Sequence, residues 1–165
     1  MPTNNKNFLG PSGFRLVFDR LPNVVYFSQS TSIPSITLGT VTVSSPILDY
    51  PIPGEKLTYS PFDVTFRVDE NMENYLEIMN WLVGLGSPQT TETRRLLTAK
   101  MFNGIYSDAT LVILSSKYNP NLRVKFHNMF PETLSELRFE TTDPDVTYLQ
   151  ATASFRYSLF TVERV

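Results

Sequence analysis

Few side chains in this sequence could carry out catalysis. His127 is the only histidine and cysteine is absent, which excludes a thiolate metal site, a metal cluster with two or more histidines and a histidine relay with a spare ligand. Glu70, Glu73 and Glu77 recur at three- and four-residue spacing, so one helix face could pair two of them as acid and base. An acidic first helical turn that complements the helix dipole explains the same spacing more simply. We therefore expect no catalytic residue and no metal site.

Other binding motifs are equally weak. Asp143 and Asp145 flank Pro144 in a predicted turn, but calcium needs more oxygen ligands than this segment offers. Neither the Gly-x-Gly-x-x-Gly pattern nor a P-loop occurs, so we expect no bound cofactor. A hydrolytic or carbohydrate-active β-sandwich would need two carboxylates on convergent strands, and the sequence identifies no such pair. We expect a protein that is not an enzyme.

The composition favours a mainly β domain. Aromatic residues make up 13% of the chain and favour strands. The 12 prolines, compared with 7 glycines, are typical of strand edges and of the loops between strands. With 14 Lys and Arg against 16 Asp and Glu, the net charge of -2 argues against a surface that grips nucleic acid, although DNA could still slide past. No signal peptide and no apolar run of about 18 residues occurs, so we expect synthesis in the cytoplasm and no membrane contact.

Alternation of apolar and polar residues predicts the strands. Residues 57–68 have the clearest period, with Phe62, Val64 and Phe66 on one face. The other predicted strands are 13–19 paired with 24–29, 109–115 paired with 122–126, then 134–140 and 146–162. The last strand is long and has one polar face, which fits a sheet that lines something.

One amphipathic helix should follow the strand at 57–68. The acidic step at 69–71 is a helix start signal, and Gly84, Gly86 and Pro88 end the helix. Its predicted apolar stripe consists of Met72, Tyr75, Leu76, Met79, Leu82 and Val83. Trp81 lies off this stripe, at the edge of the core or in a contact between subunits. Residues 90–101 could carry a second short helix or a polar loop.

Residues 35–56 are predicted to form an extended docking loop. Prolines at 34, 46, 51 and 53 argue against a regular central strand there. The segment is nevertheless rich in apolar residues, which would be costly on an isolated loop, so docking on a neighbour is favoured over a disordered excursion. The candidate contacts between subunits are Ile36, Leu38, Val41, Val43, Ile47, Leu48, Tyr50 and Trp81.

The predicted architecture for residues 1–165 is therefore a single β-sandwich or barrel with one amphipathic α-helix packed on the sheet. Residues 1–12 are polar and are predicted to form a flexible N-terminal arm.

The order of these elements carries a resemblance. A hairpin precedes Ile33 and Pro34, then come residues 54–56 (Gly-Glu-Lys), the strand at 62–66 and the helix with Trp81. An aromatic-Pro step at residues 130–131 and a long closing strand complete the order. In this order the chain resembles tail tube proteins of contractile-tailed bacteriophages, with the related baseplate tube-initiating and type VI secretion tube proteins.

The resemblance implies a structural protein of the virion that forms hexameric rings. The sheets of neighbouring copies would join into an inner β-barrel, the long loop and the termini would stack the rings into a tail tube, and the lumen would conduct DNA during ejection. Other tail or baseplate proteins, and a sheath where the tail has one, would be its partners. One alternative is a terminal or baseplate ring that caps or nucleates the tube. An alternative of another class is a monomeric β-barrel binding module.

Overall fold

The computed structural model describes residues 9–11, 13–86, 105–140 and 148–165. The elements run in the order β1 (Phe14–Phe18), α1 (Pro22–Tyr26), β2 (Ser28–Thr31), β3 (Ile36–Val43), β4 (Tyr50–Tyr59), β5 (Phe62–Arg67), α2 (Glu73–Gly86), β6 (Ser107–Leu114), β7 (Pro120–Leu134), β8 (Gln150–Arg156) and β9 (Leu159–Arg164). A mainly β fold with one main helix packed on the sheet is confirmed. Within the described residues, no helix has both the length and the apolar character needed to cross a membrane.

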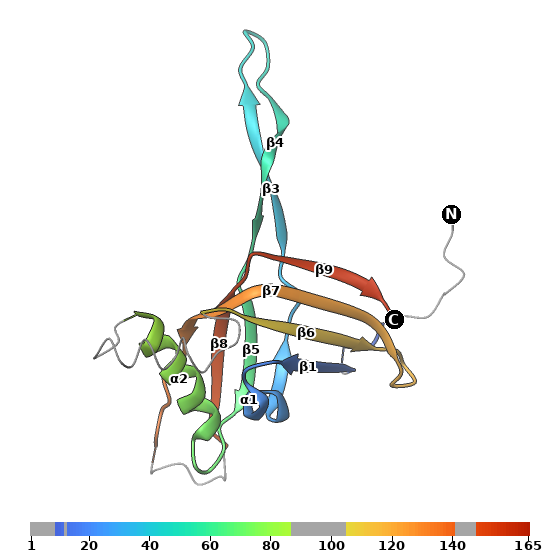
Figure 1. Ribbon diagram of the computed structural model, residues 1–165. Coiled ribbons are helices and arrows are strands. Elements are labelled where there is room, and N and C mark those ends of the chain that lie inside the picture. The colour runs from blue at the N-terminus through green and yellow to red at the C-terminus, as the bar shows by residue number, and fades with distance from the viewer. Residues whose placement is uncertain (1–8, 12, 87–104, 141–147) are drawn as a thin grey trace.

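The main sheet consists of two half-sheets that share β7 (Figure 1). Residues 120–129 of β7 pair with β6 and β9, and β1 pairs with β6; we call this set the crosswise half-sheet. Residues 130–134 of β7 pair with β8, which continues through β5 to β2; we call this set the axial half-sheet. The strands of the two halves run across one another, and β7 passes from one half to the other.

At Phe130 and Pro131, strand β7 passes from the crosswise to the axial half-sheet without ending. β7 continues through Pro131, and the pairing with β8 shifts register between Pro131 and Thr133. Asn128 has a φ of 54°, in the left-handed region that few residues other than glycine adopt. A bulge and an unusual backbone angle together allow one strand to serve two half-sheets.

The core lies between the half-sheets and α2. Phe62, Val64 and Phe66 of β5 are completely buried, as the alternation of residues 57–68 predicts. Phe62 stacks against Phe126 of β7 at a ring-centroid distance of 4.4 Å, so the core joins both half-sheets. Full burial of each such side chain stabilises the fold by about 1.5–3 kcal/mol.

Helix α2 is rotated relative to the predicted stripe. Its buried residues are Asn74, Ile78, Trp81 and Gly84. Of the predicted stripe, Tyr75 and Leu82 pack against the core, whereas Leu76, Met79 and Val83 are exposed. At the first turn, the Nδ2 atom of Asn74 donates a hydrogen bond of 2.7 Å to the carbonyl oxygen of Arg67. A polar residue that anchors the first turn to β5 therefore takes a core position beside Ile78 and Trp81, two residues that the predicted stripe left out.

Several predicted pairings are wrong. Residues 24–29 do not pair with β1, because Pro22 begins the short helix α1 and β2 then pairs with β5. No strand occupies residues 135–140, and the predicted closing strand is divided after Arg156 into β8 and β9, which join different half-sheets. Most of the predicted N-terminal arm, the possible helix within 90–101 and the turn at 143–145 lie outside the described residues.

Candidate assembly interface

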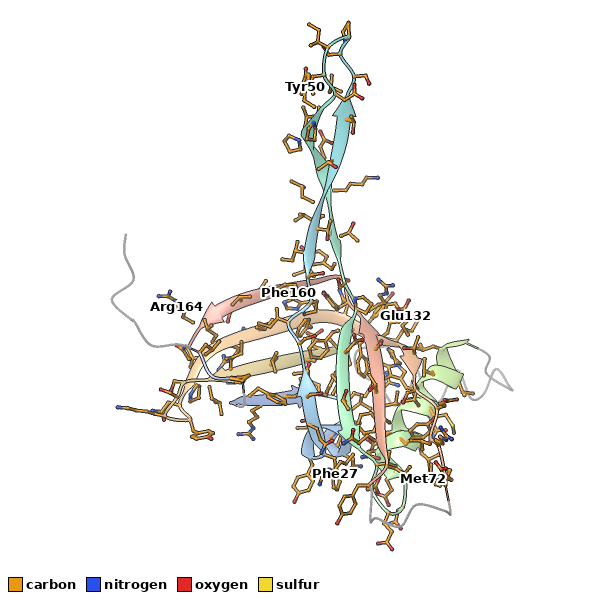
Figure 2. All side chains as sticks on the ribbon, turned by 180° about the vertical axis from the view of Figure 1, so that it is seen from behind. Phe27, Tyr50, Met72, Glu132, Phe160 and Arg164 are labelled. Carbon is orange, nitrogen blue, oxygen red and sulfur yellow. The ribbon has the colours of Figure 1, made fainter. Side chains whose placement is uncertain are left out.

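Strands β3 and β4 form a hairpin that projects away from both half-sheets (Figures 1 and 2). The predicted docking loop at 35–56 is thus a regular two-stranded ribbon. Pro51 and Pro53 fit within β4 because each strand of a two-stranded ribbon has one unpaired edge, where a missing N–H group costs nothing. An isolated hairpin is marginally stable in water, so this one gains from a partner.

The hairpin exposes an unusual amount of apolar surface. Ile47 and Leu48 in the turn are 95% and 70% exposed. Along the strands, the exposed apolar residues are Ile36, Leu38, Val41, Tyr50, Ile52 and Leu57, and Val43 is half-buried. Many exposed apolar side chains on one projecting element are typical of a site of interaction. Seven of the eight candidate contact residues lie here, whereas Trp81 is 2% exposed and lies in the core.

The register of the hairpin groups these residues. Near the root, Ile36 faces Tyr59 and Leu38 faces Leu57 across the ribbon, with the polar pair Thr37 and Thr58 on the other face. Nearer the turn, Val41 pairs with Ile52 and Val43 with Tyr50, after an irregularity that changes which face is apolar. The two strands also exchange places between root and turn, where they cross in Figure 1. The hairpin therefore carries two sets of apolar cross-strand neighbours, one near the root and one near the turn.

Aromatic side chains hold the root of the hairpin to the body. The ring of Tyr59 lies 6.0 Å from that of Tyr157 and 5.7 Å from that of Phe160. The hydroxyl of Tyr157 donates a 2.8 Å hydrogen bond to the carbonyl oxygen of Ser60. Burial raises the pKa of Tyr157, and the neighbouring Tyr59 raises it further. These contacts hold the root of the hairpin against the body. The sequence did not predict them, because Tyr59 and Tyr157 are far apart in the chain.

Charge contributes little to the hairpin surface. Residues 36–59 contain Asp49, Glu55 and Lys56 as their charged side chains. Asp49 accepts a 2.7 Å hydrogen bond from the hydroxyl of Ser44, which closes the turn. A surface of this composition binds by burying apolar area, and its affinity should depend weakly on salt.

The candidate chemical groups do not converge elsewhere. Glu77 is partly buried and accepts a 2.7 Å hydrogen bond from Asn23, and burial raises its pKa, whereas Glu70 and Glu73 are exposed. His127 lies on the surface of the crosswise half-sheet, with Nδ1 3.8 Å from a carboxylate oxygen of Asp108. Across the described ranges, no three His, Asp or Glu side chains lie together as metal ligands would.

Comparison with known proteins gives one related sequence and several related folds. No family model matches the chain. It is 28% identical over 140 residues to the tail tube terminator protein of Enterobacteria phage T4, a match that covers 83% of this chain and 77% of that protein. Its fold resembles the tube-terminating cap of the anti-feeding prophage, with a TM-score of 0.64, 12% identity and coverage of 100% and 97% of the two chains. It also resembles a chain of the sheath-tube complex of the PVC extracellular contractile injection system, with a TM-score of 0.62, 14% identity and coverage of 97% and 94%.

Proposed function

We propose that this chain, a member of the tail tube protein family of contractile-tailed bacteriophages and related injection systems, forms the ring that ends a tail tube. Within this family the sequence is compatible with two roles: a subunit that stacks into the tube itself, and a terminal or baseplate ring. The relationship to a terminator and the likeness to a cap favour the terminal ring. In either case the protein is a structural component of the tail, and its place is the virion.

The observation that carries the proposal is the apolar hairpin. Identical copies in a cyclic, head-to-tail contact close into a ring, and hexameric closure is what the resemblance implies. Such a ring would present one hairpin from every copy on the same end. Each hairpin alone buries modest apolar area, at about 25 cal/mol per Å². All of them engage at once, so the ring would hold a tube end far more tightly than one copy could.

The charge of the chain suits a ring through which DNA passes. The net charge of -2 gives no basic excess to hold phosphates. We propose that the ring surrounds the path of DNA during ejection without binding it, and that its stable partners are other tail or baseplate proteins.

A pocket among the described residues bears on the binding-module alternative. A pocket between Gly10, Gly13, Leu114 and Tyr118 has a volume of about 60 Å³. Small-molecule sites usually enclose about 300–1,000 Å³. This pocket is therefore too small for a drug-sized ligand.

Electron microscopy of the purified chain, alone and added to tubes grown from the tube protein of the same particle, tests the proposal. We expect single rings from the chain alone and shorter, ring-capped tubes after its addition. Long tubes from the chain alone would instead identify it as the tube subunit. A chain that stays monomeric and leaves tube growth unchanged would overturn both readings.

A further inference from the structure

Two parts of the body carry opposite charge. An acidic set belongs to α2 and the step before it: Asp69, Glu70, Glu73 and Glu77. Residues 69–86 contain no Lys or Arg. A mainly basic set belongs to the crosswise half-sheet and the turn between β6 and β7: Arg15, Lys117, Arg123, Lys125 and Arg164, with Asp108 and Glu163. Five cations and two carboxylates give the basic set a net charge of +3 with His127 neutral.

The acidic and basic sets lie on opposite sides of the body. In Figure 1, α2 lies on one side of the axial half-sheet, and the crosswise half-sheet extends away on the other. Figure 2 labels Met72, just before α2, and Arg164, at the end of β9, on opposite sides. A line between them runs across the direction of the hairpin. In a ring whose hairpins point along its axis, these two surfaces therefore face the neighbouring copies.

The cations of the crosswise half-sheet are grouped on its outer face. Arg15 lies opposite Val112 on β6, and Val112 lies opposite Arg123 on β7. Glu163 on β9 continues this row. Val17, two residues after Arg15 and on the same face, is exposed. The outer face thus mixes apolar and charged groups, as surfaces that contact other proteins do.

Positive charge is in excess on this face. Lys125 forms a 2.9 Å ion pair with Glu163. Its hydrogen bond lowers the pKa of Glu163, and the charge of Arg123 lowers it further, so one carboxylate serves two cations. Among the described residues, no ion pair joins Arg15 or Arg123 to a carboxylate.

The exposed side of α2 is complementary to this face. Leu76, Met79 and Val83 form an apolar surface along the helix. Glu70 and Glu73 are exposed at its start, and no ion pair joins either of them to a described cation. Apolar side chains beside unpaired carboxylates fit a face of valines beside unpaired guanidinium groups, because burial of the apolar area excludes water around the charges.

A second copy of this chain is the partner that suits both surfaces. Each copy would offer α2 to one neighbour and the crosswise half-sheet to the other, and such a head-to-tail contact closes into a ring. Opposite charges favour this contact and oppose one between two like faces. DNA or a basic partner protein would each cover only one of the two surfaces.

We infer that the outer face of the crosswise half-sheet of one copy covers the exposed side of α2 of the next, and that opposite charges select this contact. The inference rests on the proposed ring and names the contact that closes it. Its chemistry differs from that of the hairpin, which is apolar and joins the ring to a tube end.

Charge reversal on each surface tests the contact. Arg15→Glu reverses a charge on the outer face of the crosswise half-sheet, and Glu73→Lys reverses one on α2. Each variant alone would bring like charges together at every contact in the ring, so it should assemble at least about tenfold more weakly than the natural chain. Sedimentation velocity measures assembly, and thermal melts followed by circular dichroism check folding. Glu70→Lys replaces Glu73→Lys if the latter does not fold.

Mixing the two variants gives the decisive arm. The reversed half-sheet of one variant then meets the reversed helix of the other, so rings should return with equal numbers of both copies. Native mass spectrometry with one variant isotopically labelled counts them. The double variant, which carries both changes on one chain, should also form rings. Arg138→Glu is the matched control, since it makes the same charge change as Arg15→Glu at an exposed position outside both surfaces.

The outcomes separate this contact from the ring itself. Rings from each single variant at the level of Arg138→Glu would leave both surfaces for other partners and would overturn the contact, with the ring intact. Loss of rings by both variants without recovery in the mixture would also overturn it, because the two surfaces would then not meet. Failure of the natural chain to form rings would remove the proposed function, and this contact with it.

Discussion

A Cβ atom on Gly54 would lie 2.7 Å from the carbonyl oxygen of Gly39, so the hairpin strands approach each other at a point where neither carries a side chain. This is closer than real Cβ contacts, and the obstacle is backbone that cannot rotate away. The crossing of β3 and β4 therefore depends on glycine at position 54.

Gly54→Ala should push the strands apart at the crossing and misalign the two apolar halves of the hairpin. The body should stay folded, because the core contains no residue of β3 or β4. We expect at least about tenfold weaker binding to tube ends, equivalent to about 1.4 kcal/mol, measured by co-sedimentation, with an unchanged thermal melt. Gly86→Ala is the control, since nothing lies within 4 Å of its added Cβ. Tube binding by Gly54→Ala at the level of Gly86→Ala would contradict the requirement.

Val41→Asp places a charge in the apolar set near the turn, where Val41 is 54% exposed and faces Ile52. Desolvating an unpaired carboxylate in a contact is costly, so docking on a tube end should be lost while the fold is retained. Thr42→Asp adds the same charge to the opposite face and should dock normally. Circular dichroism and electron microscopy check both properties. Equal docking by both variants would show that the apolar set near the turn is not the contact.

Trp81→Ala should destabilise the body by about 3–5 kcal/mol, the usual cost of removing a large buried aromatic side chain. The indole Nε1 donates a 3.3 Å hydrogen bond to the carbonyl oxygen of Ile105, and the guanidinium carbon of Arg20 lies 3.8 Å from the ring centroid. Burial lowers the pKa of Arg20 to about 10, so it remains charged at neutral pH and keeps this cation–π contact. Urea denaturation followed by circular dichroism measures the loss. Met79→Ala, at a 37% exposed position of the same helix, should cost much less.

Glu77→Gln should make stability less dependent on pH. Burial raises the pKa of Glu77 in the folded protein, so folding favours its protonated form. The stabilising contribution is complete below the ordinary Glu pKa of about 4.3 and is lost as pH rises through the raised value. The variant should therefore gain stability relative to the natural chain as pH rises towards neutrality, as measured by urea denaturation at several pH values. Glu136→Gln, at an exposed position, should follow the natural chain. A gain confined to acid pH would contradict the assigned cause.

Sequence reasoning predicted the faces of strands better than their partners. The alternation around Phe62 and Phe66 predicted which side chains are buried, because one face of the strand must meet the core. The pairing of β1 with β6 could not be predicted, since register with a strand about ninety residues away leaves no local signal. The predicted stripe of α2 left out Ile78 and Trp81, which are buried on the same face as the hydrogen-bonded Asn74.

The candidate contacts were visible in the sequence because apolar residues are conspicuous in a segment rich in proline. The form of that segment was not visible, since the argument from Pro51 and Pro53 holds for a central strand but not for a ribbon with two free edges. Trp81 was ambiguous from spacing alone, and its place in the core follows from the rotation of the helix.

The direct passage from Tyr59 through residues 60–61 to Phe62 has a mechanical consequence. A tensile force applied along the hairpin enters β5 parallel to its length, and β5 is hydrogen-bonded on both sides, to β2 and β8. Force in this direction shears all of those bonds together, whereas a sideways pull would break them one after another. The body should therefore resist tension most strongly along the line of the hairpin.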